Sequence, residues 1–141
     1  MKNIFLDTNV VIDFLADREP FSQLAARIFN YSVEGKVELF ISAVSYNNIY
    51  YIIRQSLTNS ATIKLLDELS ELAEITDVSK AIIKKSLKTD FKDFEDAIQY
   101  NCALTIPKLD AIVTRDTKDF KKSIVPVLTP EEAISLIESN K

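Results

Sequence analysis

The sequence predicts an α/β protein in which helices cover both faces of a parallel sheet. Short runs of β-branched and aromatic residues alternate with segments whose apolar residues recur at helical spacing. Strands that alternate with helices in this way form a parallel sheet. Several segments also carry an aspartate where a strand ends, and such acids meet at the edge of an α/β sheet where ligands usually bind.

Five strands are expected, at residues 3–6, 37–41, 74–76, 111–114 and 125–128. The segments between them have helical patterns. Pro20 opens a helix whose apolar residues recur at every third or fourth position, and Gly35 lies just past its end. Ser79, Asp93 and Thr129 are predicted N-caps of later helices, because their side chains can accept a hydrogen bond from the first turn.

Two helices, at residues 42–55 and 60–72, follow one another and predict an antiparallel arm that stands off the sheet. The first is apolar or aromatic on nearly every face between Ser45 and Arg54. A helix that is apolar all round needs partners on two sides. One is the core, and the other is either a second protein chain or the helix that follows. We expect a homodimer through the aromatic helix at 45–55, with burial under the following helix as the alternative.

The length and composition predict one domain spanning residues 1–141. Apolar residues make up 47% of the chain and charged residues 27%, as in ordinary globular proteins. No apolar run approaches the roughly 18 residues of a membrane span. The N-terminus also lacks a signal-peptide pattern, because Asp7 interrupts its apolar run. We therefore expect a cytoplasmic protein that does not enter a membrane.

Composition also limits the chemistry. The chain has no histidine, which excludes Ser-His-Asp and Cys-His triads and the usual zinc sites. A net charge of −4 argues against a protein that coats nucleic acid by bulk electrostatics. Lysines do flank the later acids, where they either steer phosphates or form solvated helix faces.

Three aspartates form the candidate site. Asp7 directly follows the first strand, Asp96 lies in the segment DFEDAI, and Asp116 follows the strand at 111–114. An acid that ends a buried strand is costly unless it is paired or binds a metal. Converging carboxylates repel one another unless a positive charge lies between them, and a hard divalent cation is the natural candidate. The pattern predicts metal-assisted chemistry on a phosphate-containing substrate.

With these residues in place, the chain resembles the PIN domain family, a nuclease fold found in many toxins of toxin–antitoxin pairs. The resemblance runs nearly end to end and rests on four motifs in order: FLDTNV at 5–10, ISAVS at 41–45, DFEDA at 93–97 and IVTRDTKDF at 112–120. It implies a PIN-like three-layer α/β/α sandwich with a central parallel sheet and a protruding helical arm. It also implies a Mg²⁺- or Mn²⁺-dependent endoribonuclease acting on RNA, and a cognate antitoxin as partner.

Carried over by motif, Asp7 and Asp96 match the two central metal-binding aspartates of the family, and Asp116 matches its fourth acidic position. Asp93 and Asp119 are nearby acids that could bind a second ion or its waters, so the number of ions stays open. The hydroxyls of two threonines could support an acid or a water, and two basic residues could neutralise substrate phosphates. These supporting residues are Thr8, Thr114, Arg115 and Lys118.

One position departs from the family pattern. The family places a glutamate one turn into the helix after ISAVS, and here that position is Asn48. An amide oxygen can bind a hard cation but contributes no negative charge. Losses of this kind commonly cost about 10–100-fold in affinity or activity. Asn48 therefore leaves three outcomes: a weakened site, one tight ion with a second that arrives with substrate, or no catalysis.

Two rival functions follow. The first is a weakened or inactive PIN-like module that acts through protein partners, with the aromatic helix as its binding surface. The second is a phosphatase or phosphotransferase that uses Asp7 as nucleophile, although the second acid of an Asp-x-Asp pattern is replaced by Asn9. We expect the metal-dependent ribonuclease, as the toxin of a type II toxin–antitoxin pair.

Overall fold

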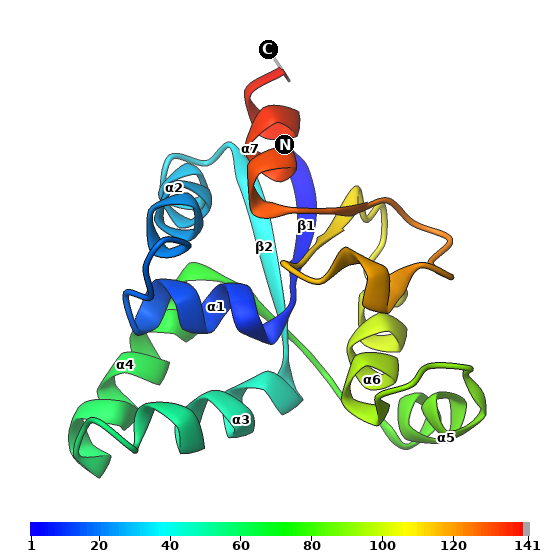
Figure 1. Ribbon diagram of the computed structural model, residues 1–141, viewed down its shortest axis with the longest axis horizontal. Coiled ribbons are helices and arrows are strands. Elements are labelled where there is room, and N and C mark those ends of the chain that lie inside the picture. The colour runs from blue at the N-terminus through cyan, green and yellow to red at the C-terminus, as the bar shows by residue number, and fades with distance from the viewer. Residues whose placement is uncertain (140–141) are drawn as a thin grey trace.

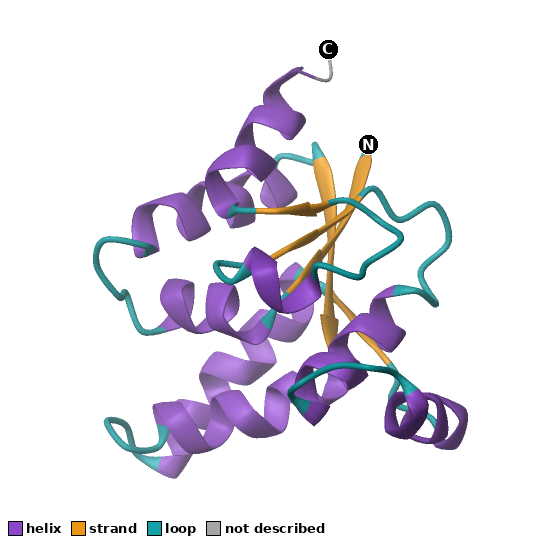
Figure 2. Ribbon diagram, turned by 45° about the vertical axis from the view of Figure 1, so that its right-hand side comes forward, coloured by secondary structure: helices purple, strands orange, loops and turns teal. Residues whose placement is uncertain are grey.

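The computed structural model describes residues 1–139 and has three layers, with a five-stranded parallel sheet between two sets of helices (Figure 1, Figure 2). The strands are β1 (Lys2–Leu6), β2 (Val37–Ser42), β3 (Glu74–Thr76), β4 (Ala111–Val113) and β5 (Val127–Leu128). The α-helices are α1 (Thr8–Leu15), α2 (Ser22–Val33), α3 (Ala43–Ile53), α4 (Asn59–Leu72), α5 (Lys80–Lys88), α6 (Phe94–Ala103) and α7 (Pro130–Ser139). The expected α/β/α architecture is confirmed.

The order of the strands positions the site. The sheet runs β3-β2-β1-β4-β5, so the chain builds outward from β1 to β3 and then returns to the other side of β1. All four pairings are parallel, and Leu6 of β1 lies opposite Val113 of β4. The order of the strands therefore reverses between β1 and β4, and clefts in open α/β sheets form at such a switch point.

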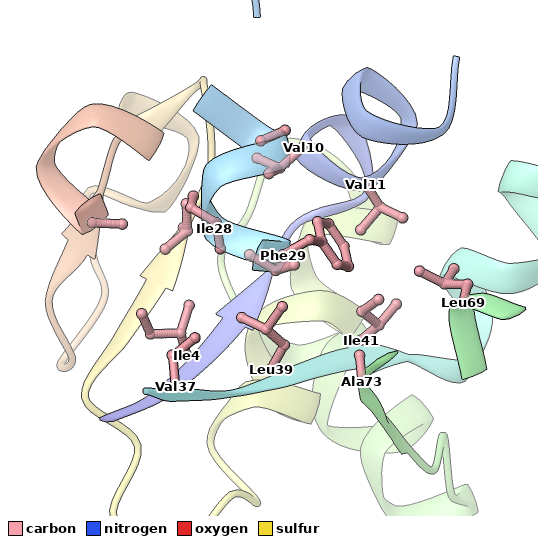
Figure 3. Close-up of a cluster of buried hydrophobic side chains, with 14 of the residues drawn as sticks. Ile4, Val10, Val11, Ile28, Phe29, Val37, Leu39, Ile41, Leu69 and Ala73 are labelled. Carbon is pink, nitrogen blue, oxygen red and sulfur yellow. The ribbon is translucent and has the colours of Figure 1, made fainter. Parts of the chain in front are cut away.

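The larger core lies on one face of the sheet, against α1, α2 and α7 and the inner sides of α3 and α4. Figure 3 shows how Ile4, Leu39 and Ile41 of the strands meet Ile28 and Phe29 of α2. The Phe29 ring stacks on Phe14 of α1, with ring centroids 4.1 Å apart. α2 keeps one apolar stripe because its apolar residues recur at helical spacing, and the turn after it passes through Gly35 at φ +77°.

The second core lies on the opposite face, between the sheet and α5 and α6. Phe5 and Ile112 point to this side while their strand neighbours point to the other, as the alternation of side chains in a strand requires. Ile98 and Cys102 of α6 and the ring of Phe120 complete it. This packing fixes the first turn of α6 beside the end of β1.

The arm is formed by α3 and α4, which extend away from the sheet together (Figure 1). Ile49 and Ile53 of α3 are buried, so part of the aromatic helix is covered within the chain. Its other side remains open: Tyr51 is 65% exposed and Ile52 is 40% exposed. Packing under α4 thus covers one side only.

Three local details differ from expectation. Pro20 does not open α2, because residues 19–21 form a turn and the helix begins at Ser22, with Phe21 as its N-cap. β5 is shorter than residues 125–128, because Pro126 has no N–H to donate and Val125 bonds instead to the hydroxyl of Ser123. A 3₁₀ helix, η1 (Thr117–Phe120), follows β4 and carries Phe120 into the core. Across residues 1–139, none of the helices is both long enough and apolar enough to cross a membrane.

Candidate active site at the carboxyl edge of the sheet

Asp7 lies at the centre of the site because β1 is the central strand. Its backbone N–H donates to the carbonyl of Val113, 2.9 Å away, so β1 and β4 end side by side. Its Oδ1 accepts from the N–H of Thr8 at 2.8 Å and caps α1, while Oδ2 accepts from the hydroxyl of Thr114 at 2.8 Å. Asp7 is only 7% exposed. The side chain is therefore held in one orientation at the end of the strand.

Asp96 comes from the first turn of α6. Asp93 is the N-cap of this helix, as predicted, and its Oδ1 accepts from the N–H of Asp96 at 3.1 Å. The Asp96 side chain is half-buried, whereas Asp93 is exposed. The cap thus fixes the backbone that presents Asp96, while Asp93 itself remains accessible.

These carboxylates act on one another electrostatically. Burial raises the pKa of Asp7 from 3.8 to about 6; hydrogen bonds from Thr114 and Thr8 oppose the shift, and the charges of Glu95 and Asp116 add to it. Burial also raises the pKa of Asp96 to about 7, with the charges of Asp7, Asp93, Asp119 and Glu95 contributing. Burial is the larger cause, and the charge contributions indicate that these acids lie within electrostatic range of one another.

Asp116 follows β4 and is exposed. Its backbone N–H donates to the Thr114 hydroxyl at 3.1 Å, and its Oδ2 lies 3.5 Å from Nδ2 of Asn9. The other amide atom of Asn9, Oδ1, is buried and has no hydrogen-bond partner among the described residues. An unpartnered amide oxygen beside the acids is a further oxygen donor at this edge.

Glu95 belongs to the site and was missed by the sequence analysis. Its Oε2 lies 3.3 Å from the Thr8 hydroxyl and 3.5 Å from Nε2 of Gln99, one turn along α6. Gln99 is fully buried and donates at 2.8 Å both to Thr8 and to the hydroxyl of Ser45 on α3. The sequence signal was a glutamine on the buried face of α6, four residues after a glutamate.

A cleft of about 660 Å³ opens beside Asp96. Asp93 and Asp119 line it together with Asp96, so these predicted acids share one cavity. Its basic side chains are Lys92, Lys118, Lys121 and Lys122. Lys118, which the sequence analysis predicts to bind substrate phosphate, is therefore one of four lysines around this cavity.

Arg115 takes a structural role that the sequence did not reveal. Its Nε donates to Asp13 at 2.7 Å, and its guanidinium lies 4.0 Å from the ring centroid of Phe21. Asp13 is 1% exposed and also pairs with Arg18 at 3.0 Å. These contacts occupy the guanidinium, so the structure does not favour Arg115 as a phosphate ligand.

Asn48 lies half-buried on α3, one turn beyond Ser45. The hydrogen bonds that join α3 to the acidic edge come from Ser45, which contacts both Thr8 and Gln99. The link between α3 and the site is therefore made through a hydroxyl.

The donor chemistry at this edge fits a hard divalent cation. Asp7, Glu95, Asp96 and Asp116 take part in none of the ion pairs formed within residues 1–139, so none of them has a directly paired protein cation. Carboxylate and amide oxygens are the ligands that Mg²⁺ prefers. As they stand, no three Asp, Glu, His or Cys side chains of the described residues are gathered closely enough to hold an ion. The chemistry fits, and closing around an ion needs side-chain movement.

A sequence model described as the PIN domain matches residues 3–118. No curated protein matches the chain significantly. Solved structures do. A toxin–antitoxin complex from Klebsiella pneumoniae is 25% identical, covers 90% of this chain and 97% of its own, and has a TM-score of 0.63. DNA-bound VapBC from Salmonella typhimurium is 16% identical, with coverages of 92% and 99% and a TM-score of 0.68.

A third similar structure is VapC20 from Mycobacterium tuberculosis, described as a Sarcin-Ricin loop cleaving toxin. It is 13% identical, covers 77% of this chain and 86% of its own, and has a TM-score of 0.61. At these low identities, the Salmonella and Mycobacterium structures support the fold alone.

Proposed function

Because this chain belongs to the PIN domain family, we propose that it is a metal-dependent endoribonuclease and the toxin of a type II toxin–antitoxin pair. One observation carries the proposal. Buried Asp7 at the switch point of the sheet lies within electrostatic range of half-buried Asp96 and of Asp116, and none of the three forms an ion pair within residues 1–139. Carboxylates left in this state are expensive unless they bind a cation.

Asp7, Asp96 and Asp116 would hold Mg²⁺ or Mn²⁺, with Asp93 or Asp119 available for a second ion or its waters. When bound, such an ion lowers the pKa of a water and stabilises charge on phosphoryl oxygens. The hydroxyl of Thr114 and the N–H of Thr8 keep Asp7 in place. Asp116 is exposed, so its side chain has room to turn toward Asp7.

The lysines of the cleft would bind the phosphates next to the bond that is cut. Lys118 and Lys121 line the same cavity as Asp96, so a chain of phosphates can pass both. Phosphate contacts of this kind are independent of base sequence. A cavity recessed beside α6 accepts a single strand more readily than a duplex, so the proposed substrate is RNA with an unpaired region.

A cognate antitoxin is the proposed protein partner, because several of the similar structures are toxin–antitoxin complexes. The unneutralised acids would favour a basic side chain from such a partner. An antitoxin and an RNA substrate together place the proposed activity in the cytoplasm.

The proposed homodimer would form through the aromatic helix at 45–55. Tyr51 and Ile52 are 65% and 40% exposed on α3, and Leu57 and Ile63 nearby are 41% and 51% exposed. Apolar side chains gathered on one arm support an interface with a second copy. Tyr51→Lys is expected to shift the protein toward monomer in light scattering, and an unchanged mass would contradict this surface.

The test of the activity is cleavage of an end-labelled, partly single-stranded RNA with Mg²⁺, Mn²⁺ or EDTA. Asp96→Asn is prepared in parallel, and Asp67→Asn, an exposed acid on α4, is the matched control. The proposal expects cleavage that needs metal, persists in Asp67→Asn and vanishes in Asp96→Asn. Cleavage in EDTA that survives Asp96→Asn would indicate a contaminating nuclease.

The same experiment separates the rivals. Failure to cut any of a panel of looped and linear RNAs would favour the PIN-like binding module, in which Asn48 marks an inactive site. Release of phosphate from a monoester, with RNA left intact, would instead favour a phosphatase that uses Asp7 as nucleophile.

A further inference from the structure

Glu95 is placed as a cation ligand would be, although its position in the sequence suggests only a solvated acid. We propose that Glu95 is a fourth carboxylate of the cation centre and supplies the negative charge that Asn48 cannot. The inference rests on the proposed function, because it concerns the same cation.

The first support is the direction of the side chain. Glu95 lies in the first turn of α6, where acids usually face solvent and interact with the helix dipole. Here it is half-buried and its Oε2 lies 3.3 Å from the hydroxyl of Thr8, the residue directly after Asp7. The carboxylate thus reaches across to the end of β1.

The second support is a buried frame that holds it there. Gln99 is 0% exposed, and its Nε2 lies 3.5 Å from Oε2 of Glu95 and 2.8 Å from both Thr8 and Ser45. The Thr8 and Ser45 hydroxyl oxygens are 2.7 Å apart. Three helices therefore meet at this amide. Polar partners that orient a ligand in this way are a regular part of metal sites.

The third support is the remaining binding capacity of the carboxylate. Within residues 1–139, the hydrogen bonds of Glu95 are made by Oε2, so Oε1 stays available to a ligand. None of the described ion pairs neutralises it.

The helix dipole alone does not explain this placement. Glu131 occupies the same position in α7, the second residue of a ten-residue helix, and it is exposed. The helix dipole stabilises both acids, but only Glu95 contacts Thr8, the residue that follows Asp7. Glu131 is therefore the matched control.

The experiment measures Mn²⁺ binding by electron paramagnetic resonance and by calorimetry, with no RNA present. Glu95→Gln removes the charge and keeps an oxygen that can accept from Thr8 and Gln99, so the fold should persist. We expect Mn²⁺ affinity to fall about 10–100-fold. Glu131→Gln makes the same change of net charge away from the acids and should alter affinity by less than about twofold, because distant exposed charges are screened.

A second variant does not depend on the folding of Glu95→Gln. If Glu95 already supplies the missing charge, Asn48→Glu in the otherwise natural chain should raise Mn²⁺ affinity by less than about threefold. If Glu95 does not supply that charge, Asn48→Glu should raise Mn²⁺ affinity by about 10–100-fold, as expected for a restored ligand. In the Glu95→Gln background, Asn48→Glu should recover most of the lost affinity.

The failures are distinguishable. Mn²⁺ binding that is lost in Asp7→Asn but unchanged in Glu95→Gln would overturn the role of Glu95 and leave the proposed function standing. A large gain from Asn48→Glu alone would overturn it equally. Absence of Mn²⁺ binding by the natural chain would overturn both the role and the metal dependence.

Discussion

Replacing Asp7 by asparagine should stabilise this protein, although it removes a central residue of the proposed site. Asp7 is 7% exposed, and burial raises its pKa from 3.8 to about 6. At 1.36 kcal/mol per pH unit, ionised Asp7 costs about 3 kcal/mol of folding free energy at neutral pH and above. The little remaining exposure leaves little screening to reduce this figure.

Changes in the hydrogen bonds of Asp7 reduce the stability that Asp7→Asn gains. In Asp7→Asn, the side-chain oxygen can still accept from the N–H of Thr8. The side-chain nitrogen, however, must donate to the Thr114 hydroxyl, which in the natural chain donates to the Asp7 carboxylate. The hydroxyl can rotate and accept. Exchanging a charged acceptor for a neutral pair costs about 1 kcal/mol, so Asp7→Asn should gain about 2 kcal/mol.

The stability difference between Asp7→Asn and the natural chain depends on pH. A carboxyl whose pKa is raised by folding contributes stability below its unfolded pKa, 3.8, and loses it as pH rises through about 6. The advantage of Asp7→Asn should therefore be full at about pH 8 and absent at about pH 4. Urea unfolding in EDTA, followed by circular dichroism, measures it. The exposed control Asp67→Asn should stay within about 0.5 kcal/mol of the natural chain.

Two results would refute this reasoning. The first is a destabilised Asp7→Asn at the higher pH. The second is an equal gain at both pH values, which would mean that the effect does not come from ionisation. Adding Mg²⁺ extends the test, because a ligand that binds the folded state stabilises it by mass action. The natural chain should gain stability with Mg²⁺, and Asp7→Asn should gain much less.

Three further predictions concern other parts of the molecule. Asp13→Ala should destabilise by about 2–3 kcal/mol in urea unfolding, since it strips Arg115 of a buried partner that is 1% exposed; a loss below about 0.5 kcal/mol would mean that the pair contributes little. Phe29→Ala should cost about 3–5 kcal/mol through the cavity left against Phe14, and Phe29→Leu clearly less. Mg²⁺ affinity should rise with pH through about 7, because Asp96, whose pKa is raised to about 7 without a cation, must be ionised to bind one; an affinity that is flat across this range would contradict that requirement.

Local signals predicted most of the fold. Ser79 and Asp93 accept hydrogen bonds from the first turns of α5 and α6, and Thr129 forms reciprocal bonds with Glu132 at the start of α7. Caps of this kind depend on residues three apart, so they can be recognised without a tertiary structure. The 3₁₀ helix η1 was not predicted, since its anchor is the burial of Phe120 against distant segments.

The candidate site was less predictable. Asp7 and Asp116 were predicted because each follows a strand, and Asp96 because its segment, DFEDA, resembles a family motif. Glu95 shares its first turn with Asp96 and has no marker of its own, so only its contacts with Thr8 and Gln99 identify it. Arg115 was predicted to contact substrate phosphates. Its pairing with Asp13 was not foreseen, because the two residues are 102 positions apart in the sequence.

The sequence alone therefore predicted the strands and most of the helices, the two faces of the sheet and the edge at which Asp7 and Asp116 lie, because periodicity and capping act over a few residues. Only the tertiary structure decided how each charge is used. It pairs Asp13 with arginines, leaves Asp7 without an ion pair among the described residues, and brings Glu95 into contact with Thr8, the next residue. Electrostatic interactions depend on distance and burial, and packing between segments far apart in the chain sets both.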